Sequence, residues 1–218
     1  MKCAGIRKTF TARRLAVIGL SILMVASVLV LSNRTRNLVI EGGIDIDTYR
    51  SVKAAVADAR TWHQNLRVEI ASPGGSALMG VDIARQLRDY SDSGAVVEVH
   101  ATALCASACT LVLASGTPGY RYIEPMALFL VHPLQSGGYG GMTCNEKKGD
   151  LRASPDRFAH REQDDRVADE LRDMLRDSYV RFTGRPAAVV EGWLHCGGES
   201  IGRGQMAVDM GIADKIGD

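Results

Sequence analysis

The chain has 218 residues, of which 46% are hydrophobic and 23% charged, and this length suits one globular domain with an appended segment. The net charge is +1, but the first 14 residues carry five bases and no acid. The remaining 204 residues hold 21 bases against 25 acids. A mildly acidic body argues against nucleic-acid binding, which usually requires a basic face.

The basic start is followed by 17 uncharged and mostly apolar residues, 15–31. A membrane-spanning helix needs about 20 apolar residues with a lower limit near 17, whereas the apolar part of a signal peptide has roughly 7–15. Because no clean small-x-small cleavage site precedes Asn33, the sequence predicts an uncleaved signal anchor, with a cleaved signal peptide as the alternative. Basic residues before the span keep the N-terminus in the cytoplasm.

The predicted organisation is therefore a cytoplasmic segment 1–14, a transmembrane anchor 15–31, a polar linker 32–37 and a folded domain 38–218. The folded domain is expected outside the cytoplasm, on the periplasmic side of the inner membrane if the host is a Gram-negative bacterium.

Four of the five cysteines would then lie in an oxidising space, where disulfides persist, and only Cys3 would stay in the cytoplasm. Four cysteines allow three complete pairings, and the sequence does not choose among them. The spacing of Cys105 and Cys109 is a poor signal for a zinc site, since no matching Cys or His pair appears elsewhere in the chain. No metal is predicted. The four are Cys105, Cys109, Cys144 and Cys196.

In the first half of the folded domain, strands at 38–40 and 66–70 each precede a helix. The first helix opens near Asp47, a plausible N-cap, and repeats apolar residues at helical spacing. The glycine-containing turn 71–76 leads into the second helix. The first helix is expected to bury Val52, Ala55, Val56 and Ala59; the second is expected to bury Val81, Ile83, Ala84 and Leu87 and to expose Arg85, Arg88 and Asp89.

In the second half, strands are predicted at 95–99 and 127–131, on either side of the small-residue stretch 103–116. A polar arm or loop covers 135–160. Helices follow at 162–182, near 187–194 and at 204–211, and a final strand at 212–216. The 162–182 helix is expected to bury Val167, Leu171, Met174, Leu175 and Tyr179. Alternation of strand and helix predicts an α/β fold with a mostly parallel sheet.

Ser107 stands among small residues where strand turns into helix, so free N–H groups of the helix start would face its oxygen. Taken alone, the stretch fits a buried small-residue helix better than a catalytic turn, so the rest of the chain must decide between them. A serine hydroxyl needs a base, for which His132 is suited, and a third group to fix the imidazole tautomer. Gly74-Gly75 and the N–H after Ser107 are suitable donors to an oxyanion.

Three segments together resemble the ClpP-type serine peptidases of the ClpP/crotonase superfamily. They are Ser72-Pro73-Gly74-Gly75, the stretch 103–116 around Ser107, and Leu130-Val131-His132-Pro133-Leu134. The 25 residues from Ser107 to His132 match the family's nucleophile-to-base spacing. The glycine-rich segment 137–141 resembles the family's peptide-binding strand, and residues 200–214 resemble its C-terminal segment.

This resemblance implies a spiral of β-β-α units, a homo-oligomer and no cofactor. It also implies Ser107 as nucleophile, His132 as base, and Gly74 or Gly75 together with Ala108 as oxyanion donors. Glu199 aligns with the family's catalytic aspartate, with His195 and Asp150 as weaker candidates. Peptide would bind beside Gly137, Gly138 and Tyr139.

The sequence thus predicts a membrane-anchored, extracytoplasmic serine peptidase that cleaves peptides or unfolded segments without an ATP-driven unfoldase. The alternative is a catalytically inactive binding or assembly protein of the same fold, suggested by Glu199 and by the cysteines flanking Ser107. A crotonase-like acyl-thioester enzyme is disfavoured because CoA substrates are scarce outside the cytoplasm. A Ser–Lys mechanism is disfavoured because no lysine lies between Lys53 and Lys147.

Overall fold

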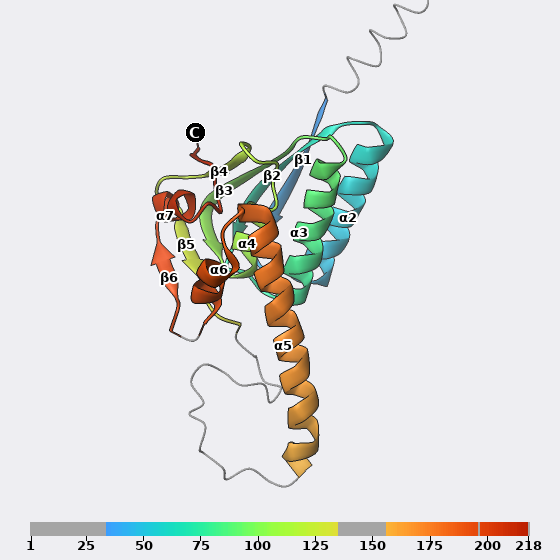
Figure 1. Ribbon diagram of the computed structural model, residues 1–218. Helices are drawn as coiled ribbons and strands as arrows, with labels where there is room; N and C mark the ends of the chain where they lie inside the picture. The colour runs from blue at the N-terminus through green and yellow to red at the C-terminus, as the bar shows by residue number, and fades with distance from the viewer. Residues whose placement is uncertain (1–33, 135–155, 196, 218) are drawn as a thin grey trace, which may run out of the picture.

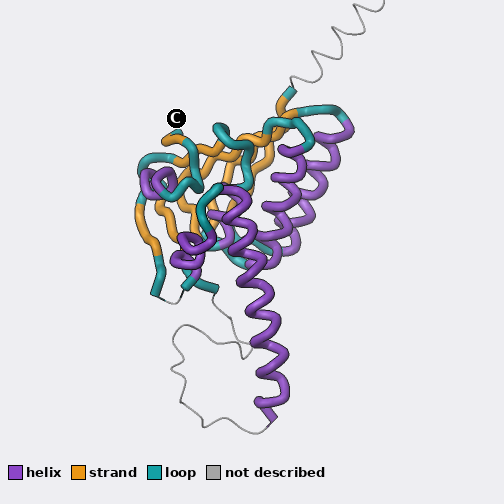
Figure 2. Tube along the Cα trace, in the orientation of Figure 1, coloured by secondary structure: helices purple, strands orange, loops and turns teal. Residues whose placement is uncertain are grey.

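The computed structural model describes residues 34–134, 156–195 and 197–217, which form a twisted sheet with helices packed against it (Figures 1 and 2). The strands are β1 (Thr35–Glu41), β2 (Asn65–Ser72), β3 (Val97–Ala106), β4 (Arg121–Ile123), β5 (Leu128–Val131), β6 (Ser200–Gly202) and β7 (Lys215–Ile216). The helices are α2 (Ile46–Thr61), α3 (Ala77–Asp92), α4 (Ala108–Ala114), α5 (Asp156–Thr183), α6 (Ala187–Leu194) and α7 (Gly204–Asp209).

The sheet has the order β1-β2-β3-β4-β7 and forks at its central strand, β3. Residues Val99–Ala101 of β3 pair with β4, whereas Leu104–Ala106 pair with β5. Every pairing is parallel except that of β5 with β6. The predicted α/β class with a mostly parallel sheet is therefore confirmed. The carboxyl end of β3, which leads to Ser107, therefore lies in the branch that pairs with β5.

Helices α2, α3, α4 and α5 lie on one side of the sheet (Figure 1). The predicted inward positions of α2 and α3 are confirmed, since all eight side chains are buried in the core. Helices α3 and α4 approach closely at Gly80, where an added Cβ would lie 2.8 Å from the Cβ of Ala108. The helix that follows Ser107 is thus packed tightly onto its neighbour.

Several local expectations are corrected. Strand β1 begins at Thr35 instead of residue 38, because Thr35 to Asn37 pair with β2. Helix α2 is capped by Asp45 and not Asp47, since the Asp45 carboxylate accepts the N–H groups of Asp47 and Thr48 at 3.0 and 2.9 Å. The short strands β4 and β6 were not predicted, because three residues are too few to show an alternating pattern.

Two side chains lie on the opposite side from the one predicted. Arg88 is buried, stacks on the ring of Phe182 at 5.2 Å and donates to the Phe182 carbonyl at 3.1 Å. Val167 is exposed, because it lies on α5 before the helix reaches the core. Within the described residues, no helix is both long and apolar enough to cross a membrane. The predicted anchor, residues 15–31, lies outside those residues.

A buried ion pair joins β4 to the C-terminal part of the chain. Arg121 donates Nε to Asp214 at 2.8 Å, and its Nη2 also contacts that carboxylate. Arg121 Nη1 reaches the carbonyls of Phe182 and Gly211, both at 3.1 Å. Gly119 N–H donates to Asp214 at 2.7 Å. One guanidinium thus fixes the end of α5 and the segment after α7 against the sheet.

Asp214→Asn is expected to lower the free energy of unfolding by about 3 kcal/mol at pH 7, because it leaves a buried guanidinium without its counter-charge. Burial acts to raise the pKa of Asp214, but Arg121 outweighs it and holds that pKa below 3.8. This contribution is complete above pH 3.8 and is lost as the pH falls through the lower folded-state pKa. Urea unfolding from pH 7 to 2.5 should show a steeper acid loss for wild type than for the variant; parallel curves would contradict this role.

Candidate active site

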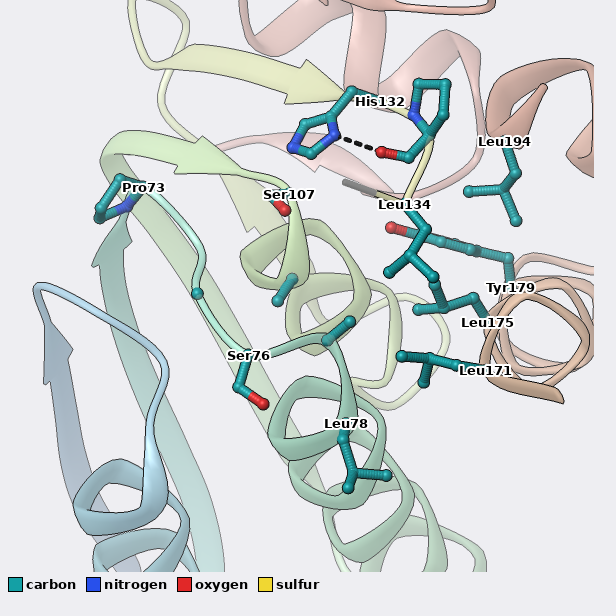
Figure 3. A pocket seen from close by; sticks show the side chains of 14 residues that line it. Pro73, Ser76, Leu78, Ser107, His132, Leu134, Leu171, Leu175, Tyr179 and Leu194 are labelled. Atoms are coloured by element: carbon teal, nitrogen blue, oxygen red, sulfur yellow. Dashed lines mark hydrogen bonds between the residues drawn. The ribbon is translucent and has the colours of Figure 1, made fainter. Parts of the chain in front are cut away.

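Ser107 is the single residue between β3 and α4, and its backbone has a conformation that L-residues rarely adopt. Its φ is 58° and its ψ is −126°, outside the regions open to side-chain-bearing residues at low cost. Its N–H donates to the Leu130 carbonyl at 2.8 Å, and its carbonyl accepts from the N–H and hydroxyl of Thr110 at 2.9 and 2.7 Å. The strand therefore turns abruptly into the helix, and the hydroxyl projects toward a cleft (Figure 3).

The Gly74-Gly75 loop passes directly beside Ser107, with φ of 93° and 152°. A Cβ on Gly74 would lie 2.6 Å from the Ser107 Cβ, and one on Gly75 would lie 2.4 Å from the Ile44 carbonyl oxygen. Both positions therefore require glycine, for backbone conformation and for space.

The two glycines differ in what their N–H groups do. The Gly74 N–H donates to the buried Ser72 hydroxyl at 3.0 Å. Within the part of the chain that the structure describes, the Gly75 N–H has no hydrogen-bond acceptor. The same holds for the Ala108 N–H, which lies at the start of α4 where no intrahelical acceptor exists. Two backbone donors without an acceptor among the described residues thus belong to residues that line the same cleft as Ser107. The sequence left Gly74 and Gly75 as equal candidates, and this geometry favours Gly75.

His132 follows β5 and faces the same cleft as Ser107 (Figure 3). Its ring is held by a 2.6 Å hydrogen bond between Nδ1 and the Pro133 carbonyl oxygen. Since a carbonyl only accepts, Nδ1 carries the hydrogen, and in the neutral ring Nε2 has a free lone pair. The imidazole is therefore in the tautomer that can accept a proton at Nε2.

Glu199 immediately precedes β6, and His132 immediately follows β5. Both residues therefore lie one position beyond the last pair of the antiparallel β5–β6 ladder, Val131 with Ser200. The Glu199 side chain is exposed, and no hydrogen bond between described residues joins it to His132. His195 ends α6 and is also exposed. The other candidates from the sequence, Asp150, Gly137, Gly138 and Tyr139, lie outside the described residues.

A disulfide joins Cys105 and Cys109, the two residues that flank Ser107 at a distance of two positions on either side. Both cysteines are completely buried. This bond settles a pairing that the sequence left open. Cys144 and Cys196 lie outside the described residues.

The cleft has a volume of about 440 Å³ and is apolar on the side away from Ser107. That wall was missed by sequence reasoning, because helical periodicity marked Leu171, Leu175 and Tyr179 only as core and gave no signal at the other wall residues. Tyr179 belongs to the wall and bonds Thr110 through its hydroxyl at 2.6 Å. Burial raises the pKa of Tyr179 to about 12, so its hydroxyl stays neutral. The apolar lining is Leu78, Leu134, Leu171, Leu175 and Leu194.

Comparison with known proteins identifies a family and several relatives, among them the following two. A family profile described as Clp protease matches residues 24–218. An ATP-dependent Clp protease proteolytic subunit of Leuconostoc citreum (strain KM20) is 27% identical over 110 residues, 50% of this chain and 54% of that protein. The corresponding subunit 2 of Gluconobacter oxydans (strain 621H) is 34% identical over 109 residues, 50% of this chain and 48% of that protein. The chain spans about half the length of the curated relatives it matches.

Proposed function

The chain belongs to the Clp protease family, and from this premise we propose that it is a serine peptidase with Ser107 as its nucleophile. One observation carries the proposal. Ser107 is held in a strained conformation in a cleft that Gly75, Ala108 and His132 also line, and the N–H groups of Gly75 and Ala108 have no acceptor among the described residues. Strain that the surrounding structure maintains is typical of functional sites.

In the proposed reaction, Ser107 Oγ attacks the carbonyl carbon of a peptide bond while His132 Nε2 accepts the hydroxyl proton. The N–H groups of Gly75 and Ala108 donate to the oxyanion of the tetrahedral intermediate, and such fixed donors stabilise the charge as it develops. The imidazolium then protonates the leaving amine, and an acyl-enzyme remains on Ser107. Water, deprotonated by His132, releases the acid product and restores the hydroxyl.

We assign the third role to Glu199, which, like His132, lies one position beyond the last pair of the β5–β6 ladder. The Pro133 carbonyl fixes the same ring nitrogen, but only a carboxylate adds a charge that stabilises the imidazolium. Glu199→Gln is accordingly expected to lower kcat by about 10²–10⁴-fold with little change in melting temperature, because the side chain is exposed. Steady-state kinetics on a fluorogenic peptide measures this. A fall of less than threefold would instead assign the orienting role to the Pro133 carbonyl.

The proposed substrates are peptides and unfolded protein segments. The cleft has an apolar wall facing the serine, which suits an extended chain with apolar side chains. The two relatives are named as proteolytic subunits, and on that basis we propose that this chain also forms a homo-oligomer. A monomeric mass by light scattering at micromolar concentration would contradict that part.

The test of the function is hydrolysis of unfolded casein, without ATP, by wild type and by Ser107→Ala. Wild type should release peptides steadily and the variant should release none, since no other group takes the place of the hydroxyl oxygen. If wild type binds casein without cleaving it, the chain is a binding protein that keeps the fold without turnover. Equal hydrolysis by both proteins would reject Ser107 as nucleophile.

We further propose that the domain is anchored outside the cytoplasm. The proposal is supported by the uncharged run 15–31 after a basic segment and by the Cys105–Cys109 disulfide, a bond that persists in oxidising compartments. Such a location would separate the domain from ATP-driven partners in the cytoplasm, which agrees with the hydrolysis without ATP expected above. Alkaline phosphatase fused after residue 218 should be active in intact cells; an inactive but expressed fusion would contradict export.

A further inference from the structure

The Cys105–Cys109 disulfide closes a five-residue loop with Ser107 at its centre. Cys105 is the second-to-last residue of strand β3, and Cys109 is the second residue of α4. Among the described residues, only His63 and Ser107 have a positive φ without being glycine. His63 lies in an exposed turn, whereas Ser107 stands at the cleft. The covalent bond therefore spans the one strained position to which the proposed chemistry is assigned.

The other forces on this turn are hydrogen bonds at the Ser107 backbone. Its N–H is held by Leu130, and its carbonyl by Thr110. These contacts fix the peptide groups but do not tie the end of β3 directly to the start of α4. The disulfide does so, at a Cα–Cα separation of 5.2 Å. It thereby restricts the backbone torsions of Ala106, Ser107 and Ala108, which direct the Ser107 hydroxyl and the Ala108 N–H.

Breaking the bond would have a geometric consequence. Two thiol sulfurs must stand farther apart than two bonded ones, and both cysteines are completely buried. Their side chains belong to the hydrophobic core, and the turn between them is itself confined, since a Cβ on Gly74 would lie 2.6 Å from the Ser107 Cβ. Close-packed interiors transmit such changes to their neighbours. The turn would therefore shift when the sulfurs separate.

We propose that the Cys105–Cys109 disulfide is a positioning device for the nucleophile, so that the oxidised chain is the active form and reduction lowers activity while the fold persists. The inference rests on the proposed function of Ser107. Reduction by a dithiol breaks the S–S bond and adds two electrons and two protons, giving two thiols, while the reductant becomes a cyclic disulfide. Re-oxidation by a small disulfide reverses the exchange.

The test uses a background in which Cys3, Cys144 and Cys196 are replaced by serine, so that only this pair remains. The protein is compared in its oxidised form, after unfolding and refolding with dithiothreitol, and after re-oxidation with glutathione disulfide. A Cys105→Ala/Cys109→Ala variant lacks both sulfurs and needs no reductant. Leu113→Ala, in the buried end of α4, is the matched control that loses stability without touching the bond.

The rate of fluorophosphonate labelling is measured well below the melting temperature of every form. We expect it to fall at least about tenfold on reduction and in the double variant, since small misplacements of a reacting group cost up to about 10²-fold. It should recover on re-oxidation and stay within twofold of wild type in Leu113→Ala. For peptide hydrolysis, kcat should fall and KM should change little.

Two results would contradict the positioning role of the disulfide, and each differs from the result that would reject Ser107 as nucleophile. Equal labelling rates in the oxidised, reduced and double-variant proteins, with only the melting temperature lowered, would overturn the positioning role and leave a purely structural bond. Faster labelling after reduction would also overturn the positioning role, because the disulfide would then inhibit the nucleophile. If the oxidised protein is not labelled at all, the proposed function of Ser107 fails, and that result is separate from either outcome.

Discussion

Replacing His132 by asparagine is expected to lower kcat for peptide hydrolysis by about 10³–10⁴-fold. Asparagine has a similar size but cannot accept a proton near neutral pH, so the Ser107 hydroxyl would keep its proton during attack. The side chain is only half-buried, and the melting temperature should therefore change by a few degrees at most. Single-turnover kinetics with an activated peptide ester separates acylation from product release and measures the effect directly.

The matched control is His63→Asn. His63 is exposed and has a φ of 49°, a conformation that asparagine tolerates well. It lies in the turn before β2, away from the residues that line the cleft. Activity within twofold of wild type is expected for this variant. If His132→Asn retained more than a tenth of wild-type kcat, another group would have to be the base.

Gly75→Ala is expected to lower kcat/KM by at least about 10²-fold, the usual cost of losing one oxyanion donor. The new Cβ would lie 2.4 Å from the Ile44 carbonyl oxygen and 2.8 Å from the Ile44 nitrogen. Neither is the end of a flexible side chain, so the loop itself must move and carry the Gly75 N–H away from Ser107. The measurement is kcat/KM together with circular dichroism, so that activity is referred to folded protein.

Gly42→Ala is the control for backbone strain alone. Gly42 also has a positive φ, 80°, but an added Cβ meets nothing within 4 Å. This variant should lose some stability and keep its kcat/KM. A Gly75→Ala protein that is folded and retains kcat/KM within threefold of wild type would show that the Gly75 N–H is not a donor to the oxyanion.

The parts of the fold that the sequence predicted well are those with strong local signals. Helices α2 and α3 bury the residues that repeat at helical spacing, and α4 begins directly after Ser107. Ser107 and His132 were identified by their residue type and by the spacing of a resemblance. The structure brings both to one cleft.

Other features depend on contacts between distant parts of the chain and left no local pattern. Arg88 looked like a solvent-facing residue of α3 because its acceptor, the Phe182 carbonyl, lies 94 residues later. Tyr179 appeared as an ordinary core residue, although it lines the cleft and bonds Thr110. The choice between Gly74 and Gly75 required knowing that the Ser72 hydroxyl already accepts the Gly74 N–H. Each of these is decided by a tertiary partner, which sequence periodicity does not encode.

The proposed peptidase activity depends most on Ser107 being an activated nucleophile, and the site of fluorophosphonate modification tests this directly. The oxidised protein is treated with the probe, digested and analysed by tandem mass spectrometry. We expect one phosphonylated residue, Ser107, with labelling lost in Ser107→Ala and slowed about 10³-fold in His132→Asn. Modification of another serine, or equal labelling of wild type and Ser107→Ala, would contradict it.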